Sequence, residues 1–140
     1  MGESERMIVY LLRRYRIECA HNLNGLRPGH RCGRVHGHNY TIELEVTGEL
    51  DDKGMVIDAE DLDTCVRPVL ARLDHRHLNE LGQGDEGVRA SFFPLVQQPT
   101  AENIAIYLWN ALGFLSNSGR YRLTLVRVRE NEDLAAEVRR

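Results

Sequence analysis

Two stretches near the N-terminus alternate apolar and polar residues with the period of a β-strand. In residues 7–21 the apolar positions share one face, and only Arg13 is out of pattern. In residues 36–47 one face carries His36 and His38, followed by the apolar side chains of Tyr40, Ile42, Leu44 and Val46. Since side chains two apart in a strand point the same way, each stretch predicts a half-buried strand. We expect the two strands to pair antiparallel through the loop of residues 22–35.

Two later segments have the three-and-four-residue spacing of amphipathic helices. Asp58 is a suitable N-cap for the first helix, in which Pro68 is the one unfavourable residue. Its apolar stripe consists of Leu62, Val66, Val69, Leu70 and Leu73. Thr100 is the expected N-cap of the second helix, whose stripe consists of Ile104, Leu108, Ala111, Leu112 and Leu115. Residues 121–130 and 135–138 then predict two further strands.

The order strand, strand, helix, helix, strand, strand predicts an α+β fold. The simplest arrangement is a four-stranded antiparallel sheet with both helices on one face, formed by residues 1–140 as a single domain. The two edges of such a sheet are unpaired, so we expect sheets of several subunits to join into a closed barrel. The Gly-rich residues 82–98 are interpreted as a long surface loop, acting as a lid or a subunit contact.

Composition narrows the possible functions. The net charge of −3 argues against a broad nucleic-acid surface, and no apolar run is long enough to cross a bilayer. Three cysteines without a scaffold-like spacing indicate a reducing compartment, so we expect a cytoplasmic protein. Of the 18 basic residues only Lys53 is a lysine. Arginine suits planar and phosphate anions, which is compatible with a small phosphorylated ligand.

Three histidines lie where the predicted hairpin begins and ends. His21 closes the first strand, while His36 and His38 open the second, so antiparallel pairing brings the three imidazoles together. Three histidines can bind zinc and leave a fourth position free for water or substrate. An alternative is a closed structural site in which Cys32 supplies a fourth ligand.

Two acidic positions favour a reaction over a closed structural site. Asp74 precedes His75 and can orient its imidazole; the alternative for the two is a helix-terminal charge pair. Glu130 shares a face with Val126 and Val128, and its carboxylate can bind an amidine-like edge with two parallel hydrogen bonds. The alternative for Glu130 is a solvated strand end beside Arg129.

Five short blocks, spread over residues 7–131, together resemble the 6-pyruvoyltetrahydropterin and 6-carboxytetrahydropterin synthase family. The blocks are Cys19-Ala20-His21, Cys32 with His36-Gly37-His38, the run from Asp74 to Asn79, the run from Pro99 to Asn103, and the strand that ends at Glu130. The resemblance implies a tunnelling fold (T-fold), assembled as a homohexamer, a dimer of trimers, with sites between subunits.

The resemblance also implies roles for individual residues. His21, His36 and His38 would bind Zn²⁺, and Cys32 would accept a proton. Asp74 and His75 would relay that proton across a subunit boundary. Glu130 would be the pterin anchor, counted with the catalytic residues, and Thr100 and Glu102 would help to bind substrate.

The implied reaction is zinc-dependent conversion of 7,8-dihydroneopterin triphosphate to 6-carboxy-5,6,7,8-tetrahydropterin, with release of acetaldehyde and triphosphate. Three residues separate Cys32 from His36, which resembles the bacterial 6-carboxy branch that serves queuosine and other 7-deazaguanines. The alternatives are a lyase that stops at 6-pyruvoyltetrahydropterin and a zinc-stabilised pterin-binding module without turnover. Neither nucleic acid nor membrane is an expected partner.

Overall fold

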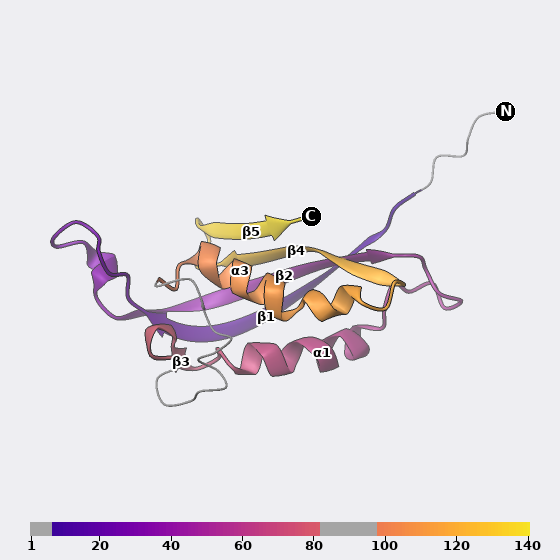
Figure 1. The fold of residues 1–140 in the computed structure, drawn as a ribbon, viewed down its shortest axis with the longest axis horizontal. Helices are drawn as coiled ribbons and strands as arrows, with labels where there is room; N and C mark the ends of the chain where they lie inside the picture. The colour runs from indigo at the N-terminus through magenta and orange to yellow at the C-terminus, as the bar shows by residue number, and fades with distance from the viewer. Residues whose placement is uncertain (1–6, 82–97) are drawn as a thin grey trace.

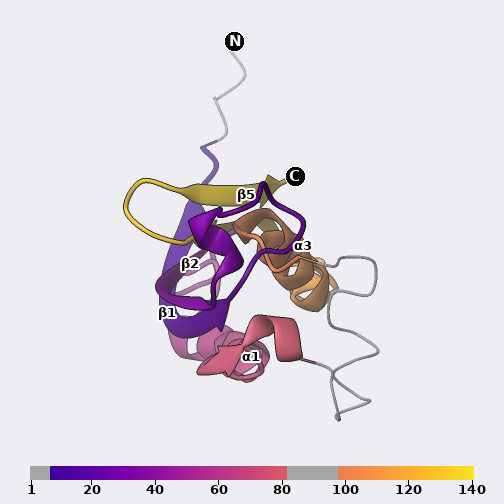
Figure 2. The ribbon, with the colours of Figure 1, turned by 90° about the vertical axis from the view of Figure 1, so that its left-hand side faces the viewer.

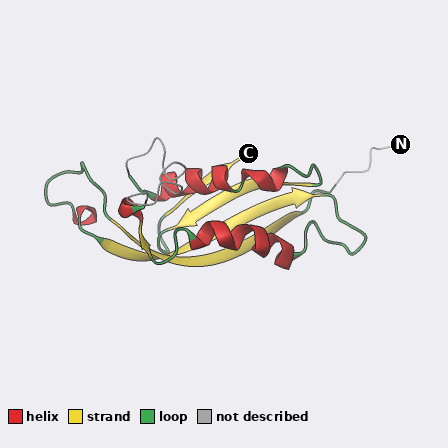
Figure 3. Cartoon of the chain, turned by 60° about the horizontal axis from the view of Figure 1, so that its bottom comes forward, coloured by secondary structure: helices red, strands yellow, loops and turns green. Residues whose placement is uncertain are grey.

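The computed structural model describes residues 7–81 and 98–140, which contain one five-stranded sheet and two α-helices. In the sheet the strand order is β3-β1-β2-β4-β5 (Figure 1). The strands are β1 (Tyr10–His21), β2 (His36–Gly48), β3 (Arg76–His77), β4 (Tyr121–Arg129) and β5 (Ala135–Arg139). The helices α1 (Ala59–Ala71) and α3 (Ala101–Ala111) lie on the same face of the sheet (Figure 3).

The predicted hairpin is confirmed. Strands β1 and β2 pair antiparallel, with Cys19 opposite His38 and His21 opposite His36. The connection between them includes the short 3₁₀ helix η1 (Arg31–Gly33), and Figure 2 views the molecule from this end. The alternating pattern places the predicted apolar face against the helices, where Tyr15, Ile17, Cys19, Tyr40, Ile42, Leu44 and Val46 are buried.

Both helices begin at the predicted caps. The side chain of Asp58 accepts a hydrogen bond from the Glu60 N–H, and that of Thr100 accepts one from the Asn103 N–H. Each cap satisfies a backbone donor that has no partner inside the helix. Helix α1 continues through Pro68, which is exposed. Helix α3 ends at Ala111, and the buried Leu115 belongs to the following 3₁₀ turn, η3 (Gly113–Ser116).

The prediction of a four-stranded, fully antiparallel sheet is wrong by one short strand. β3 has two residues and pairs parallel with Cys19 and Ala20 of β1. Two residues are too few to produce an alternating pattern, so the sequence carries no signal for this strand. The chain reaches β1 because His75 adopts a left-handed φ of 61° and its N–H donates to the Glu18 carbonyl. Of the proposed loop at residues 82–98, all but Gln98 lies outside the described residues.

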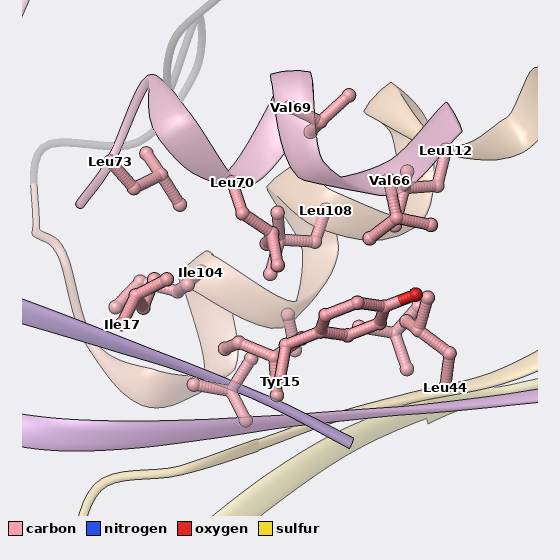
Figure 4. Close-up of a cluster of buried hydrophobic side chains, with 14 of the residues drawn as sticks. Tyr15, Ile17, Leu44, Val66, Val69, Leu70, Leu73, Ile104, Leu108 and Leu112 are labelled. Carbon is pink, nitrogen blue, oxygen red and sulfur yellow. The ribbon is translucent and has the colours of Figure 1, made fainter. Parts of the chain in front are cut away.

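A single hydrophobic layer joins the helices to the sheet (Figure 4). Val66 and Leu70 of α1 and Leu108 of α3 meet Ile17 and Leu44 from the strands, and all five are at most 5% exposed. Full burial of each aliphatic side chain contributes roughly 1.5–3 kcal/mol. Because the imidazoles of the hairpin lie on this same face, the core also positions the candidate site.

The opposite face of the sheet has no covering helix among the described elements and carries a row of alternating charges. Arg127 of β4 bonds to Glu43 of β2 at 3.0 Å and to Glu137 of β5 at 2.9 Å. Arg14 of β1 lies 3.8 Å from Glu43 on its other side. Opposite charges directly across neighbouring strands stabilise a sheet. The two faces of the sheet therefore differ sharply in polarity.

Arg13, the residue out of pattern in β1, fastens α1 to the sheet. Its guanidinium donates two hydrogen bonds to the carboxylate of Asp63, at 2.9 and 2.7 Å, and the Tyr15 hydroxyl donates a third at 2.7 Å. Hydrogen bonds from Arg13 are the main reason why the pKa of Asp63 lies well below its usual value. The interruption of the apolar pattern is thus a polar docking point between β1 and α1.

We expect Asp63→Asn to destabilise the protein by about 1–2 kcal/mol at pH 7, because the charged acceptor of Arg13 and Tyr15 is lost. A carboxylate with a lowered pKa stabilises the fold fully above its unfolded pKa of about 4, and this contribution declines as the pH falls from that value toward the lower native pKa. Urea unfolding between pH 7 and pH 2.5 should therefore show the difference from the wild type shrinking below about pH 4. Asp133→Asn, at an exposed position, is the control. A difference that stays constant over this range would contradict the assignment.

Candidate functional site

The three predicted histidines converge at one end of the β1–β2 hairpin. The Nε2 atom of His21 lies 3.0 Å from Nε2 of His36 and 3.1 Å from Nε2 of His38. Within the described part of the chain, these three side chains form the one group of histidine, cysteine and acidic residues whose ligand atoms are close enough to hold a metal ion. His21 is 1% exposed, and the other two rings are half-buried. The strand register alone brings them together, because His21 pairs with His36 and His38 follows two residues later.

Backbone carbonyls orient two of the rings. Nδ1 of His21 lies 2.7 Å from the Pro99 carbonyl, and Nδ1 of His36 lies 2.7 Å from the Arg34 carbonyl. A carbonyl only accepts hydrogen bonds, so each Nδ1 carries the proton and each Nε2 presents a lone pair. Two lone pairs 3.0 Å apart repel each other unless a cation lies between them. The donor set therefore fits a metal ion.

The surroundings favour the neutral, metal-binding form of the rings. Burial lowers the pKa of His21 and of His38, and the neighbouring His36 lowers both further. Glu130 acts in the opposite direction, with its carboxylate 3.8 Å from Nε2 of His21 and 3.9 Å from Nε2 of His38. The hydroxyl of Tyr40, 3.3 Å from Nδ1 of His21, stays protonated because burial raises its pKa.

Glu130 lies at the site, at the end of β4 and on the helix-covered face as predicted. Its backbone N–H donates to the Leu134 carbonyl, which closes the turn into β5. Its side chain is only 11% exposed. A carboxylate in this position, next to three imidazoles, can accept hydrogen bonds from a ligand that enters the site.

Cys32 lies in η1, on the loop that joins the two histidine-bearing strands. Its carbonyl accepts a hydrogen bond from the Leu23 N–H at 2.8 Å, and its N–H donates to Nδ1 of His30 at 3.0 Å. The side chain is half-buried, and it is not a member of the three-imidazole group. This arrangement favours an open metal site over a closed site with a cysteine ligand.

The structure does not bring Asp74 and His75 to the imidazoles within one chain. Asp74 accepts a hydrogen bond from the Glu18 N–H at 2.9 Å and lies 3.0 Å from Nδ1 of His75. Nε2 of His75 lies 3.4 Å from the carboxylate of Glu18, and the His75 side chain is 73% exposed. Glu18 alternates with the buried Ile17 and Cys19, so the His75 imidazole beside the Glu18 carboxylate lies on the side of the sheet without helices, while Asp74 lies at the edge of β1.

The remaining sequence candidates differ in how close they lie to the imidazoles. Thr100 directly follows Pro99, whose carbonyl contacts His21, and its hydroxyl caps α3. Glu102 is exposed in the first turn of α3. Cys19 is buried and donates to the Leu73 carbonyl at 3.1 Å, and burial raises its pKa to about 12, as expected for a packing role. The carbonyls of Pro99 and Arg34 were not predicted, because a backbone group carries no residue-type signal.

Comparison with known proteins identifies the family. Residues 10–140 match the family described as 6-pyruvoyl tetrahydropterin synthase. The chain belongs to this family.

Relatives within the 6-pyruvoyl tetrahydropterin synthase family carry two related names. A protein of Archaeoglobus fulgidus, provisionally named 6-carboxy-5,6,7,8-tetrahydropterin synthase, is 40% identical over 114 residues, which cover 81% of this chain and 84% of that protein. The 6-carboxy-5,6,7,8-tetrahydropterin synthase of Haemophilus influenzae is 32% identical over 111 residues, covering 70% and 77%. These similarities support a tetrahydropterin synthase function of the 6-carboxy or 6-pyruvoyl type.

A solved structure confirms the expected T-fold. The structure of Caenorhabditis elegans 6-pyruvoyl tetrahydropterin synthase superimposes with a TM-score of 0.75, at 27% identity and over 96% of both chains. Within residues 7–81 and 98–140, no helix has the length and apolar character needed to cross a membrane.

We expect one divalent metal ion to bind per chain at the three imidazoles. His36→Ala removes one of the three ligands. Loss of a group that merely hydrogen-bonds to a metal ligand weakens metal affinity by roughly 10–100-fold, so loss of the ligand itself should weaken it by more. Metal content after dialysis, followed by competition with a chromogenic chelator, measures the effect. His75→Ala is the matched control, since its exposed imidazole lies outside the group. Equal affinity in the two variants would show that the metal lies elsewhere.

Proposed function

We propose that the protein is a zinc-dependent lyase that converts 7,8-dihydroneopterin triphosphate to 6-carboxy-5,6,7,8-tetrahydropterin, releasing acetaldehyde and triphosphate. The observation that carries this proposal is the set of three converging imidazoles with Glu130 beside them and Cys32 outside the group. A ligand set without the thiol leaves both a metal position for substrate and a free sulfur for proton transfer.

The donor set supports zinc as the metal. Three neutral imidazoles without a carboxylate or thiolate ligand are a known zinc arrangement, and harder cations prefer oxygen ligands. His21, His36 and His38 would hold the ion. When bound, zinc supplies electrophilic stabilisation of negative charge that develops on substrate oxygen.

The chain's own residues then have separate tasks. Cys32 takes a carbon-bound proton of the substrate. The Glu130 carboxylate accepts two parallel hydrogen bonds from the pterin edge, which holds the substrate side chain toward the imidazoles. Thr100 and Glu102, at the first turn of α3, help to bind substrate.

The 6-carboxy reaction is favoured over the 6-pyruvoyl reaction by the short connection between Cys32 and His36 and by the names of the more similar relatives. The 6-pyruvoyl alternative is favoured by the Caenorhabditis elegans structure and its 27% identity. Formation of the 6-carboxy product would place the protein in 7-deazaguanine biosynthesis, the route to queuosine, in the cytoplasm.

A homohexamer, built as a dimer of trimers, accounts for features that a single chain leaves unexplained. Within the described sheet, β3 covers β1 only at Cys19 and Ala20, so most of the outer edge of β1 has no strand partner. The adjoining N-terminal part exposes the large apolar side chains of Met7, Ile8, Val9, Tyr10 and Leu12. Edge pairing between subunits would satisfy that backbone and bury those side chains.

The position of Asp74 and His75 supports a shared site. Asp74 lies at the edge of β1, and the His75 imidazole beside it is 73% exposed and outside the three-imidazole group of its own chain, which supports a role at a site on a neighbouring subunit. There the Asp74 carboxylate would orient the His75 imidazole, which would pass the proton to or from Cys32.

We expect incubation of the zinc-loaded protein with the triphosphate to yield 6-carboxytetrahydropterin and acetaldehyde, identified by mass spectrometry and an aldehyde-trapping assay. Cys32→Ala should retain zinc and lose turnover by at least about 100-fold, since a positioned base contributes roughly 10²–10⁴-fold. Cys65→Ala, at another half-buried cysteine, is the control.

The products separate the alternatives. 6-Pyruvoyltetrahydropterin without acetaldehyde would replace the proposal with the 6-pyruvoyl reaction. Binding of the pterin without conversion would identify a zinc-stabilised binding module.

Shared sites predict complementation between two inactive variants. Cys32→Ala and His75→Ala should each be inactive alone, and mixed hexamers should regain activity because some sites combine intact residues from two different subunits. Unfolding and refolding the two variants together, then assaying the mixture, measures this. The mixture of Cys32→Ala with Cys32→Ser is the control. Absence of recovery in mixed hexamers would contradict the shared site.

A further inference from the structure

The three residues that follow His21 are held from both sides by carboxamide side chains. Asn79, in the 3₁₀ helix η2 (Leu78–Glu80), accepts from the Asn22 N–H at 2.9 Å and donates to the Asn22 carbonyl at 2.7 Å. Gln98, just before α3, accepts from the Asn24 N–H at 2.9 Å and donates to the Asn24 carbonyl. Each side chain therefore pairs with the backbone as a neighbouring strand would, through one donor and one acceptor.

Leu23, between Asn22 and Asn24, is hydrogen-bonded to the backbone of Cys32. The Leu23 N–H donates to the Cys32 carbonyl at 2.8 Å, across the base of the β1–β2 loop. The backbone N–H and carbonyl groups of Asn22 and Asn24, on either side of Leu23, are taken by the two carboxamides. The Leu23 N–H is thus kept pointing at the turn that carries the thiol.

The two carboxamide side chains, Asn79 and Gln98, together form a bracket around residues 22–24. This bracket is connected to the three-imidazole group. The Asn103 side chain donates to the Gln98 carbonyl at 2.8 Å, and the adjacent Pro99 carbonyl lies 2.7 Å from Nδ1 of His21. On the other side, Nε2 of His77 lies 3.0 Å from the Asn22 side-chain carbonyl. One continuous set of contacts therefore links the position of His21 to the position of Cys32.

We propose that Asn79 and Gln98 are positioning residues, which hold Cys32 at a fixed place relative to the three imidazoles by bracketing residues 22–24. This inference rests on the proposed function, in which Cys32 transfers the proton. Only a carboxamide offers a donor and an acceptor in one rigid plane at this spacing, and a carboxylate of the same size would place a second acceptor against the backbone carbonyl.

The test uses isosteric variants, Asn79→Asp and Gln98→Glu, with Asn110→Asp on the exposed side of α3 as the matched control. Each test variant should retain zinc and lower kcat about 10–100-fold, with KM changed by less than about threefold, because displacement of the reacting group costs rate more than binding. The alanine variants at both positions should act in the same direction.

A second readout does not depend on turnover. The rate at which iodoacetamide alkylates Cys32 in the full-length, zinc-loaded protein is followed by peptide mass spectrometry. We expect it to rise severalfold in the test variants, because the turn that carries the thiol is released. Alkylation of Cys65 in the same samples should stay unchanged and serves as the internal reference.

The outcomes are distinguishable. If the unmodified protein shows no turnover, the proposed function fails, while the alkylation rates still decide whether the bracket holds Cys32. Rates for Cys32 equal to those of Asn110→Asp would overturn the positioning role. A fall in kcat that merely follows loss of zinc, or failure of all four variants to fold, would also overturn it, since the bracket would then hold the fold and not the thiol.

Discussion

The antiparallel register of β1 on β2 is the constraint on which the rest of the site depends. It sets His21 opposite His36 and Cys19 opposite His38, so that three imidazoles share the helix-covered face at one end of the hairpin. A slip of one residue would turn one strand's side chains to the other face and separate the rings. The register is held by the apolar positions that continue each strand into the core, including Ile17 and Leu44. Hydrophobic packing far from the imidazoles therefore sets the geometry of the three-imidazole group.

Backbone carbonyl groups orient the imidazoles that the strand register brings together. The carbonyls of Pro99 and Arg34 accept hydrogen bonds from Nδ1 of His21 and His36, which leaves Nε2 of each ring free to bind a metal. Pro99 lies just before α3, whose own start is fixed by the Thr100 cap and by the Asn103 side chain on the Gln98 carbonyl. A helix that covers the sheet thus also orients the His21 imidazole.

The two faces of the sheet carry different functional groups. The helix-covered face holds the core, the imidazoles and Glu130, whereas the other face holds the charge row around Arg127 and the exposed His75. In the proposed function, the exposed His75 imidazole and the neighbouring Asp74 act at the site of another subunit. The edge of β1 that has no strand partner, and that could pair with another subunit, continues from β3 and His75. In the proposed function, subunit assembly and catalysis are therefore linked.

Much of this protein follows from its sequence alone. Period-two alternation predicted β1 and β2, capping residues predicted both helix starts, and the spacing of His21, His36 and His38 predicted their convergence, because these signals act between near neighbours or across one hairpin. The two-residue β3, the docking of Arg13 on Asp63 and the carboxamide bracket of Asn79 and Gln98 were decided by tertiary structure. Each joins residues at least 50 positions apart in the chain. A local pattern records which face a residue takes, but not which distant group it will meet there.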